Sequence, residues 1–146
     1  MTICDSQIMP VRQPPPGAGY VAAQLAELGT EKGYDVAGPE PDKHGWPYFH
    51  VMVPGRERSV VLSFSGEVFT LRFPGGYDWM EFAQRDDDVP DVLATVVDFL
   101  RAYADPASHE VVMGGPFRRR SELRLANGAV LRRGGWSAGP PDRPQG

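Results

Sequence analysis

Cysteine is nearly absent from this sequence of 146 residues, in which Cys4 is the only one. A single thiol excludes an intramolecular disulfide and any metal site built from several cysteines. The sequence also contains no Gly-x-Ser-x-Gly elbow, no His-Glu-x-x-His pair and no Gly-Lys-Ser/Thr phosphate loop. The main hydrolase, metalloprotease and nucleotide-binding signatures are therefore missing. We expect neither a cofactor nor a metal ion.

Long apolar runs are lacking as well. No window approaches the 18 or so apolar residues of a membrane span, and the first residues lack the basic start and apolar run of a secretory signal. Asparagine is equally scarce, with Asn127 alone, whereas arginine supplies 13 of the 15 basic residues. This bias indicates a high-GC bacterial genome. We expect a cytoplasmic bacterial protein.

The residues that are present predict one folded domain. Apolar residues make up 41% of the chain and charged residues 23%, which is ordinary globular usage. A chain of this length fits one domain that buries about 68% of the surface of its unfolded form. We expect a flexible lead-in at residues 1–17, a single domain at 18–136 and a flexible tail at 137–146.

Alternating apolar residues predict a central hairpin over residues 60–73. A two-residue turn at Ser65-Gly66 places six apolar side chains on one face, namely Val60, Leu62, Phe64, Phe69, Leu71 and Phe73. A three-residue loop would turn Val68, Thr70 and Arg72 towards that face instead, so the pattern selects the even-length loop. A strand at 48–53 extends the same face by placing Phe49 opposite Leu62 and Val51 opposite Val60. These strands form an antiparallel meander.

Two helices complete the predicted core. The first begins at Ala18 and carries an apolar stripe of Val21, Leu25 and Leu28. The second follows three acidic residues at 86–88 that suit helix capping, and its stripe consists of Val89, Val92, Leu93, Val96, Leu100 and Tyr103. It should end near Asp105. Between the hairpin and this helix, the aromatic residues 77, 79 and 82 indicate a loop or a short helix.

The remaining segments are shorter. Tyr34 and Val36 indicate a first strand, followed by a loop from Pro39, and residues 110–113 indicate another. The final hairpin at Asn127-Gly128 permits a two-residue turn or a three-residue loop from residue 126 to 128. We expect the loop, because it aligns Leu123 with Leu131 and places Glu122 opposite Arg132. The fold class is α+β, a two-layer arrangement in which two helices pack on one face of an antiparallel meander sheet.

The opposite face of this sheet is the first candidate for function. If no other segment covers it, Tyr48, Met52, Val61 and Val68 form an apolar patch among polar residues. Such a composition is typical of a protein interface. The candidate partner-binding residues are Tyr48, His50, Met52, Val61, Val68 and Arg72. The alternative is that the C-terminal segment crosses this face and makes it ordinary core.

A basic segment near the C-terminus is the second candidate. From Phe117 onward there are seven arginines against Glu122 and Asp142, whereas the preceding part of the chain carries 8 basic and 17 acidic residues. The basic patch consists of Arg118, Arg119, Arg120, Arg124, Arg132 and Arg133. Arginine binds phosphate well, but pairing with acidic residues of the same chain explains the patch equally well.

Three functions follow from these patterns. The first is a non-catalytic protein-binding module, because the order of elements is similar to that of small bacterial chaperone-like and toxin-immunity domains; the partner is another protein or a second copy of the chain. The second is a nucleic-acid or acidic-partner binder through the basic patch. The third is an enzyme with an unrecognised site, in which His50 or His109 would lie near an acid in a deep cleft.

Overall fold

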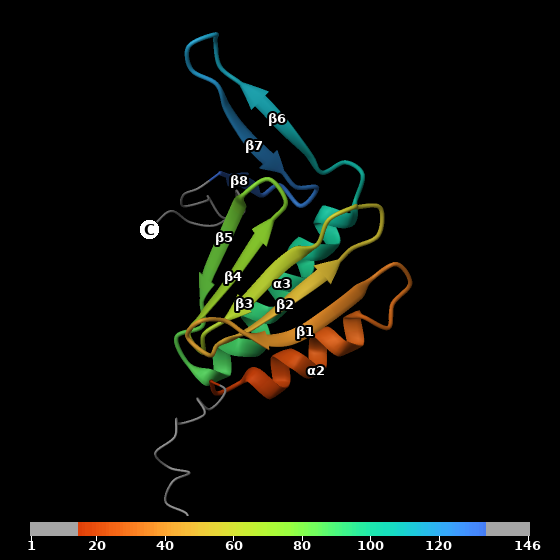
Figure 1. Ribbon diagram of the computed structural model, residues 1–146, viewed down its shortest axis with the longest axis vertical. Helices are drawn as coiled ribbons and strands as arrows, with labels where there is room; N and C mark the ends of the chain where they lie inside the picture. The colour runs from red at the N-terminus through yellow and green to blue at the C-terminus, as the bar shows by residue number, and fades with distance from the viewer. Residues whose placement is uncertain (1–14, 134–146) are drawn as a thin grey trace, which may run out of the picture.

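The structure is a computed structural model that describes residues 15–133. Its helices and antiparallel strands form an α+β fold with a strand meander, which confirms the predicted class (Figure 1). The predicted tail at 137–146, Cys4 and most of the predicted lead-in lie outside the described residues. Neither helix in the described part of the chain is long and apolar enough to cross a membrane.

Five strands form the main sheet in chain order. They are β1 (Asp35–Pro41), β2 (Pro47–Met52), β3 (Val60–Phe64), β4 (Val68–Phe73) and β5 (Tyr77–Phe82). Phe49 pairs with Leu62 and Val51 with Val60, as predicted. The six apolar residues of the central hairpin are all fully buried. The alternation of apolar residues therefore identified the inner face of the sheet correctly.

The turn of the central hairpin lies one residue later than predicted. Phe64 pairs with Phe69, and the backbone N–H of Ser65 donates to the carbonyl of Val68, so the turn residues are Gly66 and Glu67. Gly66 has a φ of 101°, which glycine adopts without strain. The Ser65 hydroxyl accepts a hydrogen bond from the Val68 N–H at 3.1 Å and closes the turn. The loop length is even in both registers, so the buried face is the same.

Two other segments were assigned wrongly from the sequence. The aromatic stretch is neither loop nor helix but strand β5, in which Tyr77 and Trp79 point into the core and pair with β4. Strand β1 continues through Pro39 to Pro41, where the sequence indicated a loop. Proline is tolerated there because β1 is an edge strand and its pairing with β2 shifts between Ala37 and Glu40.

The helices are α2 (Ala18–Leu28) and α3 (Val89–Ala104), the latter preceded by the 3-10 turn η1 (Asp86–Asp88). All predicted stripe residues are buried in one core with the inner face of the sheet. Phe99 of α3 lies against Trp79, with ring centroids 4.5 Å apart. The side chain of Asp88 does not cap α3; it accepts a hydrogen bond from the backbone N–H of Arg85 instead.

A second sheet is built from β6 (His109–Met113), β7 (Arg120–Arg124) and β8 (Val130–Arg132). Leu123 pairs with Leu131 across the predicted three-residue loop, and Gly128 has a φ of 95°. Buried Ser108 joins this sheet to α3, since its hydroxyl donates to the Ala102 carbonyl and accepts from the Ala126 N–H. The β6–β7 hairpin projects from the main sheet beyond this junction (Figure 1).

Burial of the inner face predicts how substitutions in β3 and β4 change stability. Leu62→Ala and Phe69→Ala should each lower the free energy of unfolding by about 2–5 kcal/mol, because each leaves a cavity in a closely packed core. Ser63→Ala, on the other face of β3, should cost well under about 1 kcal/mol. Urea unfolding of the three variants measures the difference. Equally small effects from all three would contradict the register.

Candidate functional site

The outer face of the main sheet carries the predicted partner-binding residues. Strand alternation places on it Tyr48, His50 and Met52 from β2, Val61 and Ser63 from β3, and Val68, Thr70 and Arg72 from β4. Strand β5 adds Asp78, Met80 and Phe82, which the sequence analysis missed. None of these eleven side chains is buried by the described residues, in contrast to the inner face. The predicted alternative, an ordinary core, is not formed by residues 15–133.

A groove of about 480 Å³ lies on this face. Its lining residues are Asp42, Trp46, Val61, Ser63, Ser65, Val68, Thr70 and Arg72. Three of the six predicted partner-binding residues therefore line the groove, whereas Tyr48, His50 and Met52 lie beside it on β2. The floor is formed by β3 and β4, and the loop between β1 and β2 contributes a wall.

Trp46 is held at the groove by a compact loop. The Asp42 carboxylate accepts hydrogen bonds from the backbone N–H groups of His44 and Trp46 at 2.8 and 2.9 Å. The backbone N–H of Asp42 in turn donates to the Trp46 carbonyl at 2.9 Å. Trp46 remains 40% exposed, and its ring lies 5.1 Å from that of His44. The loop thus fixes a large, partly exposed aromatic side chain before any ligand arrives.

Periodicity could not have found Trp46, because the residue lies outside any strand. The useful signal in the sequence was Asp42, which precedes Gly45 and Trp46 in a short loop. An Asp side chain in such a loop accepts hydrogen bonds from backbone N–H groups two or more residues later. Met80 and Phe82 were harder to detect from the sequence. Tyr77, Asp78 and Trp79 alternate, but apolar Met80, polar Glu81 and apolar Phe82 reverse the pattern, although Phe82 is 51% exposed in the structure.

The charged groups of the outer face are mostly satisfied within the sheet. Arg72 donates to both carboxylate oxygens of Asp78, at 2.8 and 3.0 Å, and this hydrogen-bonded pair raises the pKa of Arg72. The Tyr48 hydroxyl donates to Glu40 at 3.1 Å, and the pKa of Tyr48 is raised because ionisation would lose that bond. An arriving partner therefore meets Trp46, Val61, Val68, Met80 and Phe82 with few unsatisfied charges among them.

Neither His50 nor His109 forms an ion pair with a carboxylate of residues 15–133. His50 Nδ1 lies 3.3 Å from the Ser59 hydroxyl, and His109 Nδ1 lies 2.8 Å from the Ala107 carbonyl oxygen. Within residues 15–133, no three His, Cys, Asp or Glu side chains are grouped in a way that would hold a metal ion.

The basic patch lies on the smaller sheet and in the segments next to its strands. Alternation places Arg120, Arg124 and Arg132 on one face, and Glu122 pairs in register with Arg132 as predicted. The carboxylate of Glu122 accepts a hydrogen bond from Arg124 at 3.0 Å, and Glu110 forms an ion pair with Arg133 at 3.8 Å. Arg118 and Arg119 lie in the loop before β7. The patch therefore lies apart from the groove, although Arg133 forms an isolated bridge with Tyr77 of β5.

Asp42 makes the order of the Trp46 loop dependent on pH. Burial acts to raise the pKa of Asp42, but the hydrogen bonds from Trp46 and His44 outweigh it and hold the pKa below the ordinary 3.8. The stabilisation is therefore fully present above pH 3.8 and is lost as the pH falls through the lowered value. The amide shifts of His44 and Trp46 in ¹H–¹⁵N spectra should follow this titration and should be disturbed throughout by Asp42→Ala. A titration midpoint above pH 3.8 would contradict the hydrogen bonds assigned to the Asp42 carboxylate.

Comparison with known proteins adds no assignment to this geometry: no protein-family model, no curated protein and no solved structure matches the chain.

Proposed function

We propose that the chain is a small, non-catalytic protein-binding module of the bacterial cytoplasm, and that it binds its partner through the outer face of the main sheet. The observation that carries the proposal is the gathering of Trp46, Val61, Val68, Met80 and Phe82 on a face that the described residues leave uncovered. Soluble monomers rarely expose a large contiguous apolar patch. Large apolar side chains grouped in this way therefore mark a site of interaction.

The chemistry of the groove favours a partner that inserts a bulky apolar side chain. Tryptophan and methionine are enriched at the centres of protein interfaces, and polar residues are typical of their rims. Here the uncharged polar lining consists of Ser63, Ser65 and Thr70. Of the two charged lining residues, Arg72 is paired with Asp78, and the Asp42 carboxylate accepts two backbone hydrogen bonds. A partner therefore needs no matching charge at the centre of the contact, and an apolar anchor supplies most of the binding energy.

The same surface accommodates a second copy of the chain. Phe82 pairs with Val68 across the sheet, so a protruding aromatic residue lies next to the groove on one face. In a two-fold dimer, each copy presents the same patch to the other. Self-association is therefore the first form of partner binding to be measured, because it requires no other component.

Val61→Asp tests the proposal directly. A carboxylate at the floor of the groove should weaken association by tenfold or more, since burying an unpaired charge against apolar groups is costly. The monomer should remain folded, because Val61 is only partly buried. Sedimentation velocity measures self-association, and capture from the native host measures binding to other proteins.

Val112→Asp is the matched control, because Val112 is 65% exposed and lies on the smaller sheet. The proposal requires an association that the wild type and Val112→Asp share and that Val61→Asp loses. Unfolding of Val61→Asp, or identical association of all three proteins, would refute binding through this face.

A further inference from the structure

The β6–β7 hairpin presents an aromatic residue to solvent at its end. Phe117, in the loop between the two strands, is 96% exposed, the largest exposure among the large apolar residues of the described chain. Gly114 makes this loop possible: its φ is 103°, and a Cβ atom there would collide with the carbonyl oxygen of Arg118. The loop is thus folded back tightly, with Phe117 next to Arg118 and Arg119. No described residue covers this ring.

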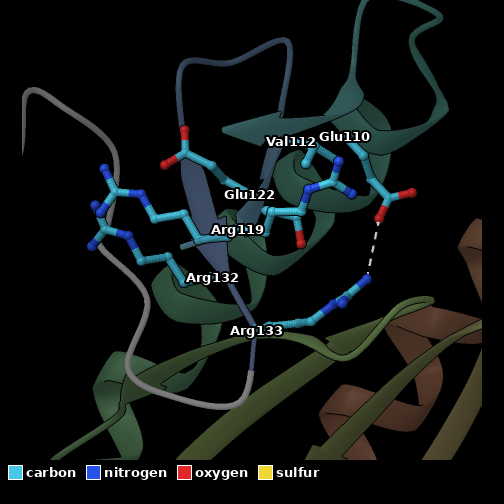
Figure 2. A pocket seen from close by; sticks show the side chains of 8 residues that line it. Glu110, Val112, Arg119, Glu122, Arg132 and Arg133 are labelled. Atoms are coloured by element: carbon cyan, nitrogen blue, oxygen red, sulfur yellow. Dashed lines mark ion pairs between the residues drawn. The ribbon is translucent and has the colours of Figure 1, made fainter. Parts of the chain in front are cut away.

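A trough runs from this hairpin to the main sheet. Its first part is a hollow of about 690 Å³ beside β7, lined by Glu110, Val112, Arg119, Arg120, Ser121, Glu122, Arg132 and Arg133 (Figure 2). Its second part is a hollow of about 540 Å³ at the junction with the main sheet, and its lining includes Arg56, Arg58, Tyr103 and His109. Glu110 and Arg133 line both hollows. The two parts therefore adjoin at this pair.

The positive charge along the trough is only partly neutralised. Arg58, Arg119 and Arg120 form no ion pair with any carboxylate of residues 15–133. Figure 2 shows the side chain of Arg133 directed towards Glu110. The two form an ion pair at 3.8 Å, and both side chains are more than half exposed. Glu110 also accepts a hydrogen bond from the Tyr77 hydroxyl at 2.6 Å, and Arg133 Nε donates to the Gly75 carbonyl at 2.9 Å. Because an exposed ion pair contributes little, the Nη groups of Arg133 are available to a ligand.

Arg56 has a different part in the trough. Its Nε donates to the Tyr103 carbonyl at 2.8 Å, its Nη2 donates to the Ser108 carbonyl at 2.7 Å, and its guanidinium lies 4.4 Å from the centre of the Tyr103 ring. These contacts tie the loop between β2 and β3 to the end of α3 and to the start of β6. Arg56 therefore fixes the position of neighbouring Arg58 relative to the hairpin.

The trough carries separated arginine side chains, and the exposed ring of Phe117 lies in the loop two residues before Arg119. This arrangement suits one class of ligand. Arginine side chains bind the phosphates of a nucleic-acid strand, and an aromatic side chain stacks on an unpaired base of any kind. A small anion would occupy only one arginine and would not account for Phe117. A flat lipid surface would meet the end of the hairpin but not Arg58 at the inner end of the trough, and one aromatic side chain anchors a protein to a membrane poorly.

We propose that the trough binds single-stranded nucleic acid, with phosphates contacting Arg119, Arg133 and Arg58 and with a base stacked on Phe117. This site is separate from the outer face of the main sheet. The chain carries a net charge of −4, which repels a polyanion, whereas residues 117–133 contain six arginines and one glutamate. The attraction is therefore local, and binding weakens as salt is added.

The experiment is a titration of fluorescein-labelled oligothymidylate and oligouridylate of about 20 nucleotides, followed by anisotropy at several salt concentrations. The slope of log K against log salt is negative, and each lost phosphate contact reduces its magnitude by about 0.7 for a single strand. Arg58→Ala and Arg119→Ala should each produce this change. Arg85→Ala, which removes one exposed arginine between β5 and η1, is the matched control and should leave the slope unchanged.

Phe117 is tested separately from charge. Phe117→Ala should weaken binding about tenfold without altering the salt slope, because it removes a stack and no phosphate contact. Phe117→Trp should restore the affinity. Positions 58, 85, 117 and 119 are all exposed, so thermal unfolding of every variant should match the wild type.

Three results would overturn the proposal. The first is no binding of either oligonucleotide at about 50 mM salt, where phosphate contacts are strong. The second is binding that Arg58→Ala and Arg119→Ala leave unchanged, which would place it outside the trough. The third is binding to phosphatidylserine vesicles that requires Phe117 while the oligonucleotides do not bind. Val61→Asp should not affect oligonucleotide binding. The test of the trough is therefore independent of the test of the proposed protein interface.

Discussion

The alternation of side chains across five consecutive antiparallel strands is the constraint on which the rest of the structure depends. Because successive residues of a strand point to opposite faces, the side chains that fill the core from β2 to β5 also determine which side chains remain outside. Phe49, Leu62, Leu71 and Trp79 are buried, and their strand neighbours are all at least partly exposed. A one-residue slip in any strand would exchange the two sets. The groove is therefore positioned by the same packing that stabilises the fold.

The smaller sheet depends on a different set of contacts. Leu123 and Leu131 join the common core, so the base of this sheet is anchored by burial of apolar surface. Arg56 and Ser108 add hydrogen bonds to the backbone at the end of α3. The Tyr77 hydroxyl adds a hydrogen bond to Glu110 of β6 at 2.6 Å, whereas Val112 and Phe117, farther along the β6–β7 hairpin, remain exposed. The two candidate surfaces thus differ in kind: the groove lies on a packed sheet, whereas the trough lies where a projecting ribbon meets that sheet.

Much of the fold followed from the sequence because its signals are local and periodic. The faces of β2, β3 and β4, both helical stripes and the three-residue loop before Ala129 were all predicted. Strand β5 was missed because its three aromatic residues do not keep one spacing. Tyr77 and Trp79 are two residues apart, as in a strand, but Phe82 follows three residues after Trp79. Periodicity could not predict the Trp46 loop or the junction between the hollows. The loop depends on hydrogen bonds that the Asp42 carboxylate accepts from backbone N–H groups, and the junction depends on hydrogen bonds that Arg56 donates to backbone carbonyls. No pattern of apolar residues reveals either set.

The central claim is that the outer face of the main sheet contacts another protein. It is tested most directly by a photoreactive phenylalanine analogue, placed at Phe82 on that face or, in a second protein, at Tyr20 on α2. The two side chains are 51% and 43% exposed, so a random collision would label both. Irradiation in the native host, followed by mass spectrometry, identifies what each position touches. The account predicts cross-links to a defined protein, or to a second copy of the chain, from position 82 and not from position 20. Cross-links from position 20 alone, or equal cross-linking from both, would contradict it.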